Sequence, residues 1–203
     1  MTDRRQCNDR LLEDVVSQAV EGGVNLVQLR EKGLPAKHLL ALAKRLREIT
    51  SGKALLFIND RIDIALACGA DGVQLGEDGM PVEAARRIAG GLLIGRSVHS
   101  VDGALRAQAD GADILVVGTI FPTGSHPDVE TAGVGLLEQL RGQVEIPYLA
   151  IGGVTVENVD SVIEAGTVGA AVITAISKNP NPEQASRGLL QRMRVSSQKG
   201  KRA

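Results

Sequence analysis

The chain has 203 residues and a formal net charge of -1; 43% of its residues are hydrophobic, but it holds only one Tyr, two Phe and no Trp. This length favours a single domain with a sizeable core, and the scarcity of aromatic side chains argues against a stacking platform for nucleic acid. No apolar run approaches the roughly 18 residues of a membrane span, and no secretory signal pattern is present. Cys7 and Cys68 match no metal-binding or redox spacing, so we expect reduced cysteines in a cytoplasmic protein that binds neither nucleic acid nor membrane.

Short apolar runs alternate with segments of helical period along the chain. The predicted strands lie at 24–31, 54–60, 72–76, 92–98, 113–121, 147–154 and 169–176. Nearly all of them are continuous rather than alternating runs, which is typical of parallel strands covered on both faces. The helical segments 35–50 and 81–91 each open with a proline, which suits a first helical turn. The pattern therefore predicts a repeated βα unit.

Three segments repeat the same order of helix end, glycine turn and buried strand. They are LACGADGVQLG (66–76), AQADGADILVVG (107–118) and IEAGTVGAAVIT (163–174). Equivalent units of this kind stack against one another. Asp71 and Asp113 lie in the Gly-Ala-Asp turns before two of these strands, so they are predicted turn or cap residues on the face that stabilises a barrel.

The seven predicted strands are one fewer than the eight of a closed parallel barrel. Residues 2–4 are followed by the helix-like segment 11–23, and no strand precedes that segment. We therefore expect an α/β fold, a (β/α)8 TIM barrel whose strand 1 is missing or truncated at the N-terminus. The open edge would invite pairing with another chain and predicts a possible homo-oligomer. Residues 1–195 are expected to form the single domain, and the polar, basic residues 196–203 a disordered tail.

Polar side chains follow the carboxyl ends of consecutive predicted strands. They are Gln28, Arg30 and Lys32, then Asn59, Asp60 and Arg61, then Gln74, Glu77 and Asp78, then Ser97 and His99, then Thr119, Thr123, Ser125 and His126. In a parallel barrel these ends converge on the active face. Salt bridges closing the barrel rim would explain any single pair, but they explain a run of successive strands poorly, so a functional face is favoured.

Two turns near the end of the chain, at 151–154 and 172–175, are predicted to bind a phosphate through backbone N–H groups, as the last strands of a barrel commonly do. Glycine in the first turn lets the backbone approach an anion. Arg30 and Lys32 on the opposite side predict a second anionic group, a diphosphate. Asp60 with an acidic partner would then hold Mg²⁺.

The motifs QLREK, NDR, LGED, SVH, FPT, IGG and ITAI, in this order, resemble the thiamine phosphate synthase and TenI superfamily. The resemblance runs from TDR at residues 2–4 to the last predicted helix. It implies a barrel that joins 4-amino-2-methyl-5-hydroxymethylpyrimidine diphosphate to thiazole phosphate, releasing diphosphate and forming thiamine phosphate. The implied partners are small phosphorylated substrates, and the implied cofactor is Mg²⁺.

The resemblance also implies roles for individual residues. Gln28 would contact the pyrimidine, Ser97 would lie beside the reacting centre, and Thr123 would lie near the thiazole phosphate. The expected catalytic residues are Ser97, Arg30, Lys32 and His126. The expected substrate-binding residues are Gln28, Arg30, Lys32, Asn59, Ser97, Thr123, Ser125, Gly152, Gly153, Ile173 and Thr174. The expected metal ligands are Asp60 and Asp78.

The chain departs from the synthase pattern at three positions. Gly79 stands where a second Mg²⁺ carboxylate is expected, and Asp78 lies one position early. His126 replaces a lysine, and Glu77 replaces a usual glutamine. One expected cation of the diphosphate site is therefore absent, and the second metal ligand is either Asp78 or Glu77.

Two other functions are weighed against the synthase. Arg96 is more typical of the TenI branch, which isomerises a thiazole carboxylate phosphate without diphosphate or metal. The histidine that this branch uses is replaced here by Thr119. A non-catalytic ligand-binding barrel is the third hypothesis. The synthase is preferred because QLREK and NDR are intact and the loop after the fifth predicted strand begins with FPT.

Overall fold

The computed structural model describes residues 1–124 and 130–200 of the chain. Seven parallel strands form one sheet and pair with one another in chain order. They are β1 (Leu26–Leu29), β2 (Leu55–Asn59), β3 (Gly72–Leu75), β4 (Leu93–Val98), β5 (Ile114–Val117), β6 (Tyr148–Ile151) and β7 (Gly169–Ala171). The seven predicted strands are therefore confirmed, and the fold is an open, TIM-like barrel.

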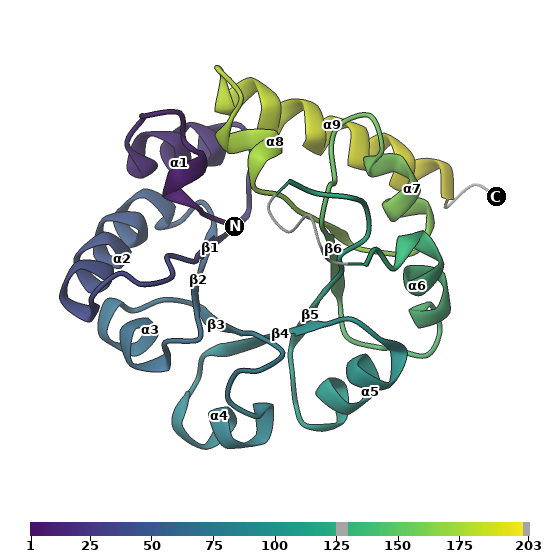
Figure 1. The fold of residues 1–203 in the computed structure, drawn as a ribbon, viewed down its shortest axis with the longest axis horizontal. Coiled ribbons are helices and arrows are strands. Elements are labelled where there is room, and N and C mark those ends of the chain that lie inside the picture. Colours follow the sequence, from purple (N-terminus) through teal and green to yellow (C-terminus); the bar gives the residue numbers. More distant parts are fainter. Residues whose placement is uncertain (125–129, 201–203) are drawn as a thin grey trace.

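Helices surround the strands on the outside of the ring (Figure 1). They are η1 (Arg4–Gln6), α1 (Leu12–Glu21), α2 (Ala36–Thr50), α3 (Ile62–Cys68), α4 (Val82–Ile88), α5 (Val101–Ala109), α6 (Gly133–Leu140), α7 (Val159–Glu164), α8 (Thr174–Ser177) and α9 (Pro182–Gly200). In α2, Leu39, Leu42 and Leu46 are buried at helical spacing, which gives the helix one apolar face toward the sheet. Among the described helices, none has the length and apolar character that crossing a membrane requires.

The ring remains open between β1 and β7, which do not pair with each other in the sheet. Residues 1–3 lie in this opening. The backbone N–H of Thr2 donates to Gln28 O at 2.9 Å, and the Met1 nitrogen donates to Val172 O at 3.0 Å. Residues 1–25, all of them described, contain no strand. The loss of a first strand stays a prediction.

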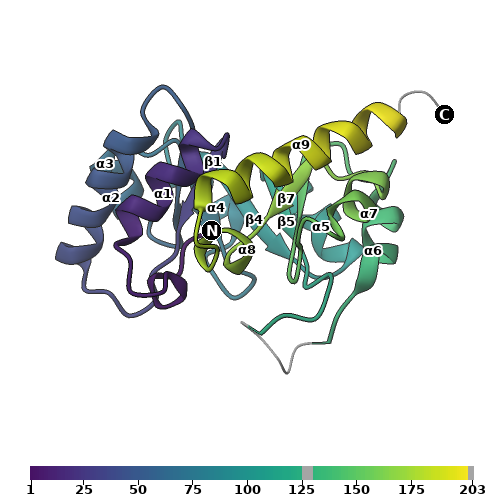
Figure 2. The ribbon, with the colours of Figure 1, turned by 90° about the horizontal axis from the view of Figure 1, so that it is seen from above.

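Helix α9 covers the outside of this opening, because it packs against both α1 and α7 (Figure 2). The packing against α1 is close: a Cβ on Gly22 would lie 2.3 Å from Glu183 O. The edge of the sheet is thus shielded within one chain, and pairing with a second copy stays a prediction.

The end of α9 corrects the predicted boundary of the tail at residue 195. The helix continues through Gly200, and the hydroxyl of Ser196 donates to Asp160 Oδ1 at 2.6 Å. Arg192 pairs with the same carboxylate, which ties the second half of the helix to α7. Residues 201–203 lie outside the described residues.

Two aspartates secure the amino end of the sheet in the same way. Asp71 Oδ2 accepts hydrogen bonds from Leu56 N at 2.7 Å and from Arg47 at 2.6 Å. Asp113 Oδ2 accepts from Ile94 N at 2.7 Å and from Arg86 at 2.6 Å. The prediction that both are structural residues at the start of strands is confirmed. Each carboxylate joins a helix to the first N–H groups of a neighbouring strand.

Candidate active site

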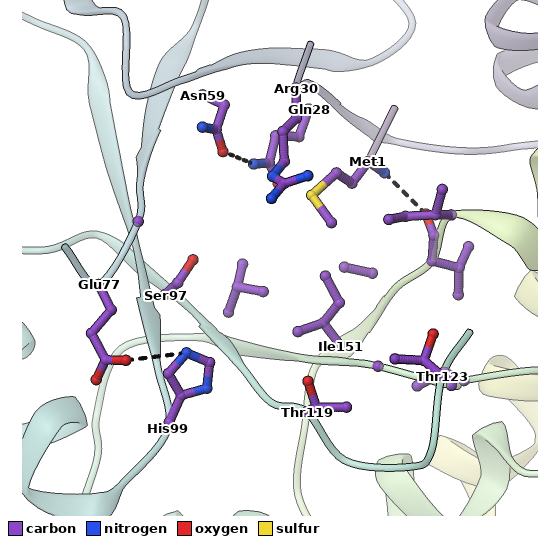
Figure 3. Close-up of a pocket in the computed structure, with 18 of the residues that line it drawn as sticks. Met1, Gln28, Arg30, Asn59, Glu77, Ser97, His99, Thr119, Thr123 and Ile151 are labelled. Carbon is purple, nitrogen blue, oxygen red and sulfur yellow. Dashed lines mark hydrogen bonds and ion pairs between the residues drawn. The ribbon is translucent and has the colours of Figure 1, made fainter. Parts of the chain in front are cut away.

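A pocket of about 590 Å³ opens at the carboxyl ends of the strands (Figure 3). This volume lies in the range of small-molecule sites. Twelve of the predicted site residues line it: Gln28, Arg30, Lys32, Asn59, Asp60, Asp78, Ser97, Thr123, Gly152, Gly153, Ile173 and Thr174. The predictions for Ser125 and His126 fall outside the described residues. The structure therefore brings together residues that are distant in sequence.

Two described residues of the predicted polar set, Arg61 and Gln74, do not line this pocket. Arg61 pairs with Asp63 on the first turn of α3, where the two side chains are partly exposed. Both residues flank the start of a helix, so the pair is a local helix-end contact. The strand-end position alone did not distinguish Arg61 from its neighbour Asp60, which lines the pocket.

The apolar part of the pocket wall was missed by reasoning from polar residues alone. Val116, Ile151 and Ala171 line it from the ends of β5, β6 and β7. Their strands were predicted, but a continuous apolar run does not reveal which side chains face the interior. Val154 and Met1 also line the pocket. One side of the pocket can therefore accommodate an apolar ring.

A chain of hydrogen bonds links the ends of β1, β2 and β3. Gln28 Nε2 donates to Asn59 Oδ1 at 2.8 Å, and Asn59 Nδ2 donates to Asp60 Oδ2 at 2.6 Å. The other oxygen of Asp60 accepts from Gly76 N at 2.8 Å. These bonds fix the two amides and the carboxylate before any ligand arrives, which is the preorganisation that a binding site needs.

Gln74 on β3 orients Ser97 on β4. The Gln74 side chain is buried and its Nε2 donates to Ser97 Oγ at 3.1 Å. The side chain lies against Gly95, where a Cβ would come within 2.0 Å of Gln74 Oε1. Because the oxygen of Ser97 accepts this bond, its O–H is left to donate toward the pocket.

The two cations of QLREK are available to a ligand. Arg30 and Lys32 line the pocket, and across residues 1–124 and 130–200 neither forms an ion pair within 4 Å. Glu31, between them in sequence, turns away and accepts hydrogen bonds from Thr2 Oγ1 at 3.0 Å and from Arg4 N at 3.1 Å. Burial raises the pKa of the Glu31 carboxyl above its usual range. The acidic residue of the motif therefore does not neutralise its basic neighbours.

The loop after β3 forms another wall and is held from β4. Arg96 donates to Glu77 O at 2.8 Å and to Met80 O at 3.1 Å. His99 Nε2 lies 3.3 Å from Glu77 Oε2, and its Nδ1 contacts Gly118 O (Figure 3). Arg96 thus supports the loop that carries Asp78 by binding its backbone carbonyls. This support accounts for an arginine at that position without a catalytic role.

The glycine turn after β6 packs closely against the segment at 119–122 and also exposes its backbone to the pocket. Gly152 and Gly153 have φ of +99° and +60°, and a Cβ on Gly153 would lie 2.4 Å from Pro122 O. Phe121 N donates to Gly152 O at 3.1 Å. In the part of the chain that is described, the N–H groups of Gly153 and Thr174 donate to no protein group. The turn thus holds the segment at 119–122, and the N–H groups of Gly153 after β6 and of Thr174 after β7 remain available to an anion.

The family comparison agrees with this geometry. The sequence model of the family described as "Thiamine monophosphate synthase" matches residues 1–176. The chain belongs to this family. The match covers β1 to β7 and all the described residues that line the pocket.

Individual members of the thiamine monophosphate synthase family are similar over most of their length. A putative thiamine-phosphate synthase from Geobacter sulfurreducens is 47% identical over 193 residues, which cover 94% of this chain and 91% of that protein. The thiamine-phosphate synthase of Pyrococcus horikoshii is 45% identical over 175 residues, covering 86% and 84%.

A solved family structure shows the same fold. The thiamine phosphate pyrophosphorylase of Pyrococcus furiosus superposes with a TM-score of 0.90 at 39% identity, covering 96% of this chain and 94% of that one. These three proteins are named as synthases or as the equivalent pyrophosphorylase. The transferase is thereby favoured, and the tautomerase alternative finds no support.

The donor set for a divalent cation is small in this member of the family. Within residues 1–124 and 130–200, no group of three or more His, Cys, Asp or Glu side chains is placed to hold a metal. Gly79 stands beside Asp60, and a Cβ there would lie 3.0 Å from Asp60 Oδ1. Asp60 and Asp78 nevertheless line the same pocket. Because Mg²⁺ is often held by one or two carboxylates together with substrate phosphates, these residues fit such an ion.

Proposed function

We propose that this chain is a thiamine phosphate synthase, which joins 4-amino-2-methyl-5-hydroxymethylpyrimidine diphosphate to thiazole phosphate and releases diphosphate. The observation that carries this proposal is that one pocket is lined both by two cations and by a glycine turn with an available backbone N–H. Arg30 and Lys32 lie at the end of β1, and the glycine turn after β6 lies on another side. Figure 3 shows Arg30 across the pocket from Thr119 and Thr123. A site for two phosphorylated substrates requires this separation.

The diphosphate would bind at the ends of β1 and β2. Arg30 presents a planar fork of N–H donors, which suits phosphate oxygens, and Lys32 adds a second positive charge. The amide of Asn59, fixed by Gln28, lies on the same wall. Mg²⁺ held by Asp60 and Asp78 would neutralise negative charge on the leaving diphosphate. His126 and Ser125 stay predicted contributors.

The pyrimidine ring would lie between the Gln28 amide and the apolar wall. Gln28 is bound through one N–H to Asn59, so its carbonyl and second N–H remain to recognise ring nitrogen and amino groups. Val116 and Ile151 supply apolar surface in the same pocket. The hydroxyl of Ser97, oriented by Gln74, would donate near the carbon that reacts.

The thiazole phosphate would bind at the turns after β6 and β7. The N–H groups of Gly153 and Thr174 are available there, and Thr123 lines the same region. Backbone N–H groups at such turns are common phosphate ligands at the end of a parallel barrel. This placement would direct the thiazole nitrogen toward the pyrimidine.

In the reaction, the bond between the pyrimidine methylene carbon and the diphosphate oxygen breaks, and its electron pair leaves with the diphosphate. A bond then forms between that carbon and the thiazole nitrogen, whose lone pair supplies the electrons. No proton has to be removed for this exchange. The residues of the chain act by holding the two rings in line and by stabilising the departing charge.

The test is a discontinuous assay for thiamine phosphate with purified protein, both substrates, and either Mg²⁺ or a chelator. Formation of thiamine phosphate that depends on Mg²⁺ is expected. Interconversion of thiazole tautomers without coupling would indicate an isomerase instead. Binding of both substrates without any product would indicate a ligand-binding barrel. Location in the cytoplasm and self-association stay predictions from the sequence.

A further inference from the structure

Thr2 contacts three polar groups at the end of β1. Its backbone N–H donates to Gln28 O at 2.9 Å, and its Oγ1 accepts from Arg30 N at 3.0 Å. The same hydroxyl donates to Glu31 Oε1 at 3.0 Å. Thr2 is buried against the end of β1, although the two segments lie more than 20 residues apart in sequence. Thr2 thus binds the backbone on both sides of Leu29, through its own N–H at Gln28 and through its hydroxyl at Arg30.

These contacts lie on the unpaired edge of the sheet. β1 pairs with β2 alone, so the peptide groups on its other side have no strand to bind. Buried peptide groups require a partner, and Thr2 supplies one for Gln28 and one for Arg30. On the other flank, the Met1 nitrogen bonds to Val172 O beside β7 (Figure 3). Residues 1 and 2 therefore join the two strand ends that border the opening.

Glu31 completes the arrangement from the strand side. Its side chain is only 5% exposed, and its carboxylate accepts hydrogen bonds from Thr2 and from Arg4 N and lies 3.6 Å from the Arg4 guanidinium. Successive residues of an extended chain point in opposite directions. With Glu31 held outward, Arg30 is directed inward, where it lines the pocket.

We propose that Thr2 and Glu31 are positioning residues for Arg30, because together they fix the backbone from which its side chain enters the pocket. This inference rests on the proposed function, which places a diphosphate at Arg30. The hydrogen bonds from β2 restrain only one edge of β1. Without Thr2, the other edge of β1 would lose its bonds at Gln28 and Arg30. A guanidinium that must meet two phosphate oxygens is sensitive to displacements of about 1 Å.

A double-mutant cycle tests this inference with inorganic pyrophosphate as the ligand. Four proteins are compared by isothermal titration: wild type, Thr2→Val, Arg30→Ala and the double variant. Thr2→Val keeps the shape of the side chain but removes its hydroxyl, and should weaken pyrophosphate binding about fivefold, the effect of one hydrogen bond. Arg30→Ala should weaken it about a hundredfold. With alanine at position 30, Thr2→Val should have less than a twofold effect.

Equal effects of Thr2→Val in both backgrounds would overturn the inference, since independent contributions add. Thr2→Ser restores a hydroxyl and should recover most of the affinity. The matched control is Thr167→Val, which removes a buried hydroxyl bonded to Val162 O at 2.8 Å, outside the pocket. It should leave pyrophosphate binding unchanged, and a loss equal to that of Thr2→Val would also count against the inference.

Steady-state kinetics separate this inference from the proposed function. Thr2→Val should raise the KM for the pyrimidine diphosphate about fivefold and leave the KM for thiazole phosphate unchanged. A wild-type protein that forms no thiamine phosphate would remove the proposed function, while the pyrophosphate cycle would still report coupling between Thr2 and Arg30. If the wild type forms thiamine phosphate but the losses of pyrophosphate affinity from Thr2→Val and Arg30→Ala add, the positioning role is wrong and the proposed function stands.

Discussion

Basic side chains differ in their pairing between the two ends of the barrel. At the amino end, Asp71 binds both the Arg47 guanidinium and a strand N–H. At the carboxyl end, Arg30 and Lys32 form no ion pair within residues 1–124 and 130–200, although both line the pocket with Asp60. Paired charges at one end stabilise the fold. The charges of Arg30 and Lys32 at the other end remain available to a ligand, as the proposed function requires.

The uncharged groups show the same contrast in another form. At the carboxyl end, Gln28 and Gln74 are buried and each bonds to a side chain on the next strand. These bonds orient Asn59 and Ser97 but leave each of them with a further donor or acceptor. At the amino end, the hydroxyl of Thr167 is bound to a backbone carbonyl. The polar side chains of the pocket are therefore held in place, while some of their hydrogen-bonding groups remain available to a ligand.

Alanine at the two glycines on either side of β6 should separate close packing from backbone strain. Gly153→Ala combines φ of +60° with a Cβ 2.4 Å from Pro122 O, so it should lower the free energy of unfolding by about 3 kcal/mol. Gly142, at the amino end, has φ of +80° but no atom within 4 Å of such a Cβ. Gly142→Ala should cost only about 1 kcal/mol. Urea unfolding of both variants makes the comparison.

Gly153→Ala should also weaken binding of thiazole phosphate while leaving pyrophosphate binding unchanged, because the anion site at that turn is disturbed. Equal stability losses in the two glycine variants would contradict the packing around Pro122. Normal affinity for thiazole phosphate would remove the backbone anion site from the proposed function.

Arginines at the two ends should separate function from stability. Arg30→Ala should lower kcat/KM for the pyrimidine diphosphate about a hundredfold, since charge-assisted hydrogen bonds are lost. Its free energy of unfolding should stay within about 0.5 kcal/mol of wild type, because no ion pair within the fold is broken. Arg47→Ala, which loses the bond to Asp71, should cost about 1 kcal/mol of stability and leave kcat/KM unchanged. Equal effects on activity would contradict the division between the ends.

The sequence predicted the order of strands well because apolar runs and helical periods alternate clearly. It placed the ends of strands less well. The run at 113–121 is mostly apolar up to Phe121, but β5 ends at Val117. The run at 169–176 contains both the strand β7 and the first residues of α8. A short apolar run does not reveal where strand pairing stops, since strand and buried helix look alike.

The candidate site was predicted from strand ends, which a parallel barrel brings together. What could not be predicted depends on three-dimensional contacts between distant segments. Glu31 resembles its neighbours Arg30 and Lys32 in being charged, but only its contact with Thr2 shows that it faces away. The sequence predicted that Gly153 lets the backbone approach an anion. The structure adds that Pro122 O leaves no room for a Cβ at this position.

Alanine at Asp71 should affect stability, whereas alanine at Asp78 should affect the Mg²⁺ dependence of activity. Asp71→Ala leaves the buried N–H of Leu56 and the guanidinium of Arg47 without their partner, so it should lower the free energy of unfolding by about 1–2 kcal/mol. Thiamine phosphate formation should be unchanged. Asp78→Ala should leave stability within about 0.5 kcal/mol and raise the Mg²⁺ concentration needed for half-maximal activity. Unchanged Mg²⁺ dependence would exclude Asp78 as a metal ligand.

The smallest expected effect compares two glutamates that flank β1. Burial raises the pKa of Glu31, with Asp3, Arg4 and the bonds from Thr2 as its other neighbours. Its contribution to stability is therefore present below the ordinary value near 4.5 and is lost as pH rises through the higher pKa of the folded state. Relative to Glu31→Gln, the wild type should lose stability as pH rises. Urea unfolding between pH 4 and 7 measures this difference.

Glu21, at the amino end, provides the opposite sign. A hydrogen bond from Lys53 lowers the pKa of Glu21, so its contribution is present at higher pH and is lost as pH falls through that lowered pKa. Relative to Glu21→Gln, the wild type should gain stability with pH, although only slightly, because the pair is exposed. If Glu31→Gln gave the same slope as Glu21→Gln, the bonds from Thr2 and Arg4 would outweigh burial, and the pKa of Glu31 in the folded state would be lowered instead of raised.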